Sequence, residues 1–348
     1  MEMRDLRYGI EIEFTGVTRR QAAETAATYF NTQSNNSRHY SRDAYNVLDS
    51  QGRIWRFISD ASIVAQKKEG RQRVSAGEEY KVELVSPICR YEDIPSIQEL
   101  VRQLRHAGAF ASQKCGIHIH VDASAFNAVS MKNLVNIMAA KEDLVYKALR
   151  VQVEREYYCK KADPQFIDEI NARKPRSLDQ VMDIWNGQGR VPTQERYHCL
   201  NLASIRKHGT VEFRLFNSDI HHAGKIKTYI QLALAITAQA LNQTGASRIK
   251  TQSSNEKYTF RTWLLRLGMI GDEFKTARTH LLEHLDGCIA WKDPAQAIAQ
   301  KERLRQKREK ARQEAAQAAS FDAAAMMAGP ESTDEPDTAL DYAMSMNL

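Results

Sequence analysis

The 348-residue sequence lacks the features that mark several common classes of protein. Its five cysteines are odd in number, are widely spaced and form no C-x-x-C pair, which argues against a disulfide framework or a zinc knuckle. Neither a G-x-x-x-x-G-K-[ST] phosphate loop nor a G-x-G-x-x-G dinucleotide motif is present. The sequence therefore predicts neither a disulfide-stabilised domain nor a nucleotide site of the P-loop or Rossmann type.

Long apolar runs are also missing. The longest helical apolar run, residues 229–241, is too short to span a bilayer and contains Gln231 and Gln239. The first nine residues, MEMRDLRYG, are charged and contain no apolar core of a signal peptide. We therefore expect a protein of the reducing cytoplasm without a membrane partner.

The overall composition suits a soluble globular protein. Apolar residues make up 43% of the chain and charged residues 26%. The net charge of +6 fits an anionic ligand such as a nucleotide and does not demand nucleic acid. Composition also suggests three parts: a globular domain over residues 1–290, a charged helix over 291–320, and an acidic tail over 321–348 that we expect to be disordered.

One stretch, Tyr8-Gly9-Ile10-Glu11-Ile12-Glu13-Phe14, organises the rest of the chain. Its period of two predicts a β-strand, in which successive side chains point to opposite faces. Its apolar side chains then share one face, and Glu11 and Glu13 share the other, about 7 Å apart along the strand. Two carboxylates this close repel each other unless a cation lies nearby.

Three further predicted strands repeat this division into an apolar and an ionisable face. The strand over residues 80–86 carries Glu83, the strand over 116–122 carries His118 and His120, and the strand over 210–216 carries Glu212 and Arg214. If helices cover the apolar face, the ionisable groups line the opposite one. Several carboxylates together favour hard cations such as Mg²⁺ or Mn²⁺. An arginine beside them suggests that an anion also binds there.

The order of elements predicts an α+β fold with a largely antiparallel, curved sheet and helices on one face. We expect polar loops over residues 31–43 and 66–79, and a long helix over 128–160. We also expect a strand over 197–205, and helices over 223–242, 259–268, 272–285 and 294–319.

Simpler interpretations compete with a site. Alternating glutamates on a half-exposed strand are commonly just a solvated face. The two histidines alone could bind zinc in a metal-dependent hydrolase, but no H-E-x-x-H pattern and no nearby third histidine accompany them. Agreement among four separate strands favours a shared site over four unrelated solvated faces.

Read in order, six motifs resemble the amidoligase family of carboxylate–amine ligases, which is related to glutamine synthetase and glutamate–cysteine ligase. They are G-I-E-I-E-F, W-x-x-x-S-D-A-S-I, E-L-V-S-P, G-I-H-I-H-V-D, R-Y-x-x-L-N-x-x-S and T-V-E-F-R-L-F, spread over about residues 8–217. The resemblance implies a glutamine-synthetase-like catalytic domain. It also implies an ATP-dependent reaction in which a carboxylate is phosphorylated and an amine displaces phosphate from the acyl phosphate.

The resemblance also implies metal ligands on the four strands. Glu11 and Glu13 correspond to ligands of two different metal ions, Mg²⁺ or Mn²⁺. Glu83 corresponds to a partner of Glu13, and His118 to a ligand beside Glu11 and Glu212.

Other positions correspond to groups that handle phosphate or substrate. His120 would contact the nucleotide phosphates, and Arg214 would steady the phosphoryl group in transfer. Arg196, Asn201 and Arg206 fall where relatives bind phosphate or the substrate carboxylate. Asp60 falls where the family has an aspartate for the incoming ammonium, although Ala61 follows it where the family has glycine.

The expected partners are an amino-acid or peptide carboxylate and an amine, and the resemblance leaves a homo-oligomer open. One alternative is a catalytically silent relative that binds a nucleotide or nucleic acid. It is motivated by residues 301–312, where seven of twelve residues are Lys or Arg. A solvated helix explains this stretch equally simply, so we expect no nucleic-acid partner.

Overall fold

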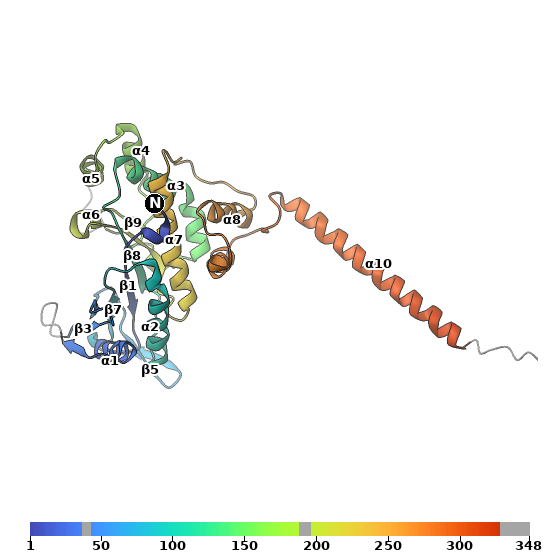
Figure 1. Ribbon diagram of the computed structural model, residues 1–348, viewed down its shortest axis with the longest axis horizontal. Coiled ribbons are helices and arrows are strands. Elements are labelled where there is room, and N and C mark those ends of the chain that lie inside the picture. Colours follow the sequence, from blue (N-terminus) through green and yellow to red (C-terminus); the bar gives the residue numbers. More distant parts are fainter. Residues whose placement is uncertain (37–42, 188–195, 328–348) are drawn as a thin grey trace, which may run out of the picture. The chain divides into compact units, whose positions relative to one another are not determined.

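Figure 1 shows a computed structural model, which describes residues 1–36, 43–187 and 196–327. The chain divides into two compact units, Met1–Lys292 and Asp293–Leu348. The strands are β1 (Tyr8–Phe14), β2 (Ser34–Asn36), β3 (Tyr45–Leu48), β4 (Ile54–Ile58), β5 (Gln66–Glu69), β6 (Gln72–Ser75), β7 (Val82–Val85), β8 (Gly116–Asp122), β9 (Leu200–Asn201) and β10 (Thr210–Asn217).

The helices of the first unit mostly follow the expected segments. They are α1 (Arg19–Phe30), α2 (Ile94–His106), α3 (Ala128–Leu149), α4 (Pro164–Arg173), α5 (Leu178–Asn186), α6 (Ala203–His208), α7 (Ala223–Asn242), α8 (Glu256–Arg266) and α9 (Lys275–Leu282). Short 3₁₀ turns lie at η1 (Met3–Asp5), η2 (Glu78–Tyr80), η3 (Tyr91–Asp93), η4 (Val153–Arg155) and η5 (Asp272–Phe274). Among the described residues, no helix is both long and apolar enough to cross a membrane.

Eight of the described strands form one sheet, in the order β2-β3-β4-β7-β1-β8-β10-β9. Each neighbouring pair in this sheet is antiparallel. The predicted α+β fold with a largely antiparallel sheet is therefore confirmed. β1 lies near the middle, between β7 and β8, as its central place in the sequence pattern suggested. Strands that are far apart in the sequence thus lie side by side around β1.

The apolar face of the sheet is buried under helices. On β1, Ile10 and Ile12 are 1% and 0% exposed, and their cross-strand neighbours on β7 and β8 are Leu84, Ile117 and Ile119. α7 packs on β8, α3 on β10, and α1 on β3 and β4. These helices cover the sheet beside β1 and β8 in Figure 1. Burying such aliphatic side chains stabilises the fold by about 1.5–3 kcal/mol each, and it forces the alternate side chains onto the other face.

Several local predictions were wrong. Residues 66–79, expected to be a loop, contain the β5–β6 hairpin, whose turn places Gly70 at φ 62°. The expected loop at 31–43 contains β2, while residues 37–42 lie outside the described part of the chain. These strands pair through main-chain hydrogen bonds, and their side chains do not alternate between apolar and polar. No periodic pattern therefore predicted them.

Two predicted elements were too long. The helix expected over 128–160 ends at Leu149, because Arg150 adopts a left-handed conformation that terminates α3. The strand expected over 197–205 shrinks to the two residues of β9, after which the chain turns into α6. Both errors lie beside the functional cavity described below.

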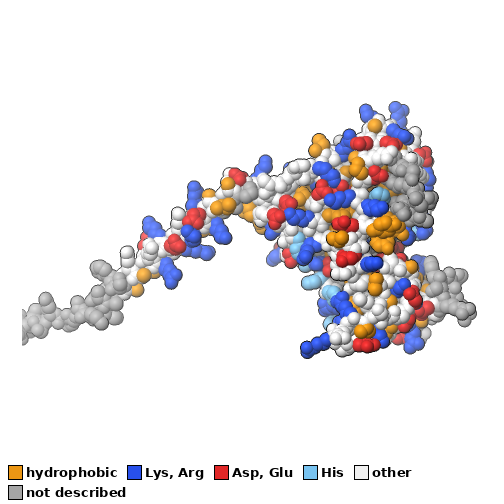
Figure 2. Space-filling model, turned by 180° about the vertical axis from the view of Figure 1, so that it is seen from behind, with side chains coloured by type: hydrophobic (Ala, Val, Ile, Leu, Met, Phe, Trp, Pro, Cys, Tyr) orange, Lys and Arg blue, Asp and Glu red, His pale blue; other side chains and the backbone are white. Residues whose placement is uncertain are grey.

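The second unit contains one long helix, α10 (Pro294–Met327), whose described side chains are largely exposed. Figure 2 shows Lys and Arg side chains distributed along it. The helix continues past Phe321, where we predicted the acidic tail to begin, because alanines favour helix over residues 323–325. Residues 328–348, which hold most of the predicted tail, lie outside the described part.

Candidate active site

The ionisable side chains of four adjacent strands meet as cross-strand pairs. In the antiparallel register, Glu13 lies opposite Glu83 and Glu11 lies opposite His118. One strand further on, His120 lies opposite Glu212. Opposed residues in such a pair have Cβ atoms about 4.5–5.5 Å apart. The sheet therefore assembles one cluster from residues separated by up to about two hundred positions.

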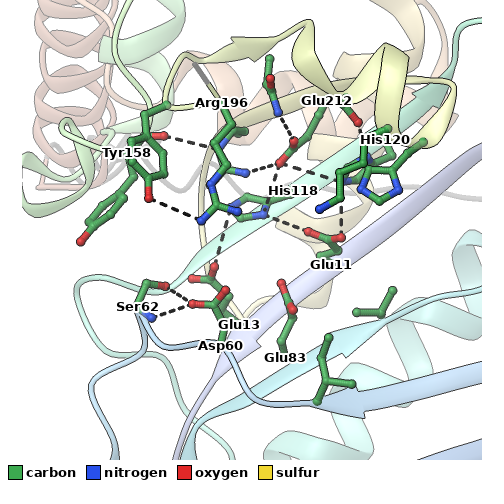
Figure 3. Close-up of a pocket in the computed structure, with 18 of the residues that line it drawn as sticks. Glu11, Glu13, Asp60, Ser62, Glu83, His118, His120, Tyr158, Arg196 and Glu212 are labelled. Carbon is green, nitrogen blue, oxygen red and sulfur yellow. Dashed lines mark hydrogen bonds and ion pairs between the residues drawn. The ribbon is translucent and has the colours of Figure 1, made fainter. Parts of the chain in front are cut away.

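The two histidines lie among the carboxylates. Nδ1 of His118 is 3.1 Å from Oε2 of Glu11 and 3.5 Å from Oε1 of Glu212, and its Nε2 is 3.7 Å from Oε1 of Glu13. Nε2 of His120 is 3.4 Å from Oε1 of Glu11 and 3.8 Å from Oε1 of Glu212. Figure 3 shows these side chains turned toward a common space.

The electrostatic environment divides the four glutamates into two with a raised pKa and two with a lowered pKa. Burial raises the pKa of Glu83 well above its usual range, and the charges of Glu11, Asp60, Glu13 and Glu212 raise it further. Burial also raises the pKa of Glu13. Two of these glutamates are thus held next to other acids that disfavour their ionised form, which is the situation a bound cation would relieve.

The remaining two glutamates are ionised more easily because cations lie beside them. Burial opposes ionisation of Glu11, but its close contacts with the imidazoles of His118 and His120 lower its pKa well below the usual value. The pKa of Glu212 is also lowered, because the charge of Arg214 and both histidines outweigh burial. Conversely, burial opposes protonation of His120, but Glu11 and Glu212 raise its pKa overall.

Three overlapping groups of side chains have the spacing of metal ligands. Each group offers three ligand atoms that all lie within 4.8 Å of one another, and the groups are Glu11, Glu83 and His118; Glu11, His120 and Glu212; and Glu13, Asp60 and Glu83. Carboxylate oxygens with an occasional imidazole suit Mg²⁺ and Mn²⁺.

One histidine nitrogen within this cluster supports a metal. Nδ1 of His120 contacts the hydroxyl groups of Thr210 at 3.0 Å and Ser204 at 3.3 Å, which fix the orientation of the ring. Its buried Nε2 has no hydrogen-bond partner and faces Glu11 and Glu212. An unsatisfied buried nitrogen is costly, and a cation between it and the two carboxylates would satisfy it. The donor set therefore fits a divalent ion.

Arginine and amide side chains complete the cluster at β10. Arg214 donates to the carboxylate of Glu212 and, at 3.4 Å, to the main-chain carbonyl of Tyr158. Asn201 on β9 donates to the other oxygen of Glu212 at 2.6 Å and accepts the N–H of Ala203 at 3.0 Å. The predicted pairing of Glu212 with Arg214 on one face of the strand is thus present.

These groups line a cavity of about 1140 Å³. Its walls include Asp60, Ser62, Tyr158 and Arg196 in addition to the strand residues. The carboxylate of Asp60 accepts the N–H of Ser62 at 2.7 Å and also its hydroxyl, which holds it at the cavity wall. The cavity is thus lined by carboxylates, imidazoles and cations together.

A second cavity of about 680 Å³ adjoins the first. The two cavities share Glu11, Arg56, Val85, His120 and His208 in their walls. Apart from these, the second lining is mostly apolar or carries hydroxyl groups; it includes Gly9, Ile10, Pro87, Ile88, Ile205, Ser86, Ser124 and Thr210.

Ten of the eleven residues singled out from the sequence line the first cavity: Glu11, Glu13, Asp60, Glu83, His118, His120, Arg196, Asn201, Glu212 and Arg214. Arg206 does not line it. Its side chain is more than half exposed and contacts Asp183 at 3.3 Å, whereas the next residue, Lys207, lines the cavity. The sequence alone could not distinguish these neighbours, because both follow the strand expected over 197–205 and lie in α6, a helix that the sequence analysis did not predict.

The sequence analysis also missed several cavity residues. Arg155 and Tyr158 lie in what we predicted to be the end of a long helix, and Lys114 lies in the segment before β8. None belongs to an alternating pattern or to a motif. The positions of Arg155 and Tyr158 depend on where α3 ends, and the left-handed residue that ends it is an arginine, for which no sequence signal exists.

Comparison with known proteins identifies the family of this chain. The model of the family described as "Putative amidoligase enzyme" matches residues 4–237, which include all four site strands. The chain therefore belongs to the amidoligase family, as the six motifs suggested. No curated protein matches the sequence.

A solved bifunctional glutathione synthetase from Pasteurella multocida is similar at 12% sequence identity and a TM-score of 0.32. The match covers 81% of this chain and 47% of that protein. This chain thus spans about half the length of that relative. At this level of similarity we base no argument on it.

Proposed function

We propose that this protein is an ATP-dependent amidoligase that joins a carboxylate to an amine through an acyl phosphate, with Mg²⁺ or Mn²⁺ held by strand glutamates and a histidine. Membership of the amidoligase family supports ligase chemistry. The observation that carries the proposal for this chain is the set of three overlapping ligand groups in one cavity. Such a cluster of carboxylates suits phosphoryl transfer, which depends mainly on charge neutralisation and alignment.

In this proposal the cluster holds the metal ions at two ends. Glu11, Glu212 and a histidine would bind one ion, and Glu13 and Glu83 would bind another. The sequence comparison suggested His118 as the ligand beside Glu11 and Glu212. The compact group containing those two glutamates uses His120, while His118 groups with Glu11 and Glu83. When bound, such ions neutralise phosphate oxygens and align the transferring group.

The two cavities would divide the substrates. The second cavity, with its apolar walls and hydroxyl groups, suits a nucleoside, and it meets the acidic cluster at Glu11 and His120. The first cavity would then receive the carboxylate and the amine. Its volume exceeds the usual range of about 300–1,000 Å³ for small-molecule sites, which favours an amino-acid or peptide substrate held together with the phosphates.

Individual side chains have defined tasks in this arrangement. Arg214, fixed by Glu212 and by a main-chain carbonyl, would stabilise charge on the transferring phosphoryl group. Arg196 and Lys207 add positive charge to the wall and would bind phosphate or the substrate carboxylate. Asp60 has two possible tasks: it can bind the incoming ammonium, as the family motif suggests, or join Glu13 and Glu83 around a metal ion.

An oxygen-transfer experiment tests the acyl phosphate. The purified protein is incubated with ATP, Mg²⁺, and a pool of amino acids and short peptides whose carboxyl groups carry ¹⁸O. During ligation one carboxylate oxygen leaves with phosphate, so the released phosphate should contain ¹⁸O. A hydrolase or a simple ATPase would release phosphate whose added oxygen comes from unlabelled solvent water. Phosphate without ¹⁸O would therefore refute the proposal.

A further inference from the structure

One buried arginine of the cavity has no part in the motifs. Arg155 ends the turn η4 and is only 2% exposed. Among the described residues, no carboxylate lies within ion-pair distance of its guanidinium group. A buried charge is costly unless other polar groups satisfy it. Its contacts therefore indicate what it does.

The guanidinium group of Arg155 binds the main chain of β10 at an irregularity. Phe213 pairs with Ile119 and Phe216 pairs with Ile117, so two residues of β10 lie opposite His118 alone. Such a β-bulge bends a strand and redirects its side chains. Arg155 donates to the carbonyl of Arg214 at 2.7 Å and to that of Phe216 at 2.5 Å. One side chain thus forms hydrogen bonds with the main chain at both ends of the bulge.

The edge strand explains why an arginine is needed there. β9 pairs with β10 at Glu212 and Phe213, and the N–H of Arg214 donates to the carbonyl of Cys199 at 2.9 Å, but within the described residues no strand pairs with this side of β10 beyond the bulge. A sheet edge without a partner leaves carbonyl groups unpaired. The N–H groups of Arg155 take the place of the missing strand by donating to the carbonyls of Arg214 and Phe216.

The same arginine is also fitted to the strands on the other side. Gly116 of β8 lies against its guanidinium group, and a Cβ atom there would be 2.8 Å from Cζ of Arg155. The N–H of Gly116 donates to Glu13 at 2.6 Å. The carbonyl of Arg155 accepts a hydrogen bond from the N–H of Tyr158 at 2.8 Å. The carbonyl of Tyr158 in turn accepts a hydrogen bond from Nε of Arg214.

We propose that Arg155 is a positioning residue, which holds the bulge of β10 so that Glu212 and Arg214 face the ligands of β1 and β8. This inference rests on the proposed function only in its expected effect on the reaction. Without the guanidinium group, two buried carbonyls lose their donors and the bulge can relax. Arg214 would then no longer be held in one orientation.

The test compares Arg155→Met with Arg155→Lys. Loss of a residue that orients metal ligands typically costs roughly 10–100-fold in activity or metal affinity. We expect Arg155→Met to lower the rate of ADP formation and the affinity for Mn²⁺ within that range, with little change in the KM for ATP. A lysine keeps the charge and three N–H donors, so Arg155→Lys should recover part of the loss. Gly116→Ala should reproduce the defect by displacing the guanidinium group.

Arg19→Met is the matched control. Arg19 is 5% exposed; it donates to the carbonyls of Asp43, Glu78 and Lys81 and to the carboxylate of Asp43, and none of these residues lines the cavity. Its loss removes comparable main-chain hydrogen bonds, so it should lower the melting temperature without changing the rate or the Mn²⁺ affinity. Equal losses of rate in the two methionine variants would mean that Arg155 only stabilises the fold, and would overturn the inference.

Amide hydrogen exchange keeps the inference testable even if the wild-type protein proves not to be a ligase. Arg155→Met should increase exchange in residues 210–217, whereas Arg19→Met should increase it elsewhere. Unchanged exchange in β10 would overturn the positioning role whatever the assay shows. A wild-type protein that forms no ADP and binds no Mn²⁺, together with increased exchange in β10, would count against the proposed function alone.

Discussion

Replacing Glu83 with glutamine should stabilise the metal-free protein. Glu83 is 7% exposed and lies directly opposite Glu13. Within the described residues its side-chain carboxylate accepts no hydrogen bond and forms no ion pair. Two unit charges about 5 Å apart repel by roughly 3 kcal/mol at an effective dielectric of 20. We therefore expect Glu83→Gln to raise the free energy of unfolding by about 1–3 kcal/mol at alkaline pH, above the raised pKa of Glu83, where its carboxylate is ionised.

The pH dependence gives this prediction its sign. A carboxyl group whose pKa is raised in the folded state stabilises the protein at low pH, and that contribution is lost as the pH rises through the raised pKa. The pKa values of Glu83 and Glu13 are both raised from 4.5. The stabilisation by Glu83→Gln should therefore be small below the raised pKa of Glu83 and grow as the pH rises through it.

Thermal unfolding in EDTA measures the effect. For a domain of this size, 1 kcal/mol shifts the melting temperature by roughly 2–4 °C. Mn²⁺ should raise the melting temperature of the wild type more than that of Glu83→Gln, because the ion relieves repulsion that the variant no longer has. Glu142→Gln is the control: Glu142 is 2% exposed and pairs with Lys250, so its replacement should destabilise the protein. A destabilised Glu83→Gln at alkaline pH would refute the like-charge cluster.

Three further predictions follow from the site. Glu212→Gln should abolish ADP formation and still unfold in one cooperative transition, since the residue faces the cavity and not the apolar core; loss of that transition on calorimetry would show that its face is wrong. Lys207→Met should weaken ATP binding by roughly 10-fold, the equivalent of about 1.4 kcal/mol, whereas Arg206→Met should not, because only Lys207 lines the cavity; isothermal titration compares the two, and a larger effect of Arg206→Met would contradict the assignment. Ile88→Glu should abolish protection by ATP against thermal unfolding, because it places a negative charge in the proposed nucleoside cavity, and unchanged protection would place the nucleotide elsewhere.

The alternation of side chains predicted the centre of the fold. Period-two patterns at β1, β7, β8 and β10 identified both the buried face and the ionisable face, because side-chain direction on a strand follows from local geometry alone. The order of the strands did not follow from these patterns. It required the register, which the structure shows to pair Glu11 with His118 and Glu212 with His120.

The parts of the site that escaped prediction depend on tertiary contacts. Arg155 lies in the cavity because α3 ends at a left-handed arginine and the chain then folds back on β10. The side chain of Lys207 rather than that of Arg206 lines the cavity, and both residues lie in α6, a helix that the sequence analysis did not predict. Neither the end of α3 nor the presence of α6 leaves a periodic signal in the sequence.

The central claim is that the acidic cavity carries out ATP-dependent ligation. The most direct measurement is ADP release by the purified protein with ATP and Mg²⁺ or Mn²⁺, with and without a pool of amino acids and short peptides, alongside Glu11→Gln. Glu11 belongs to two of the three ligand groups, so its replacement should remove the metals from the site. We predict release that the pool stimulates and that Glu11→Gln loses. The absence of any release, together with no protection by ATP against thermal unfolding, would contradict the claim.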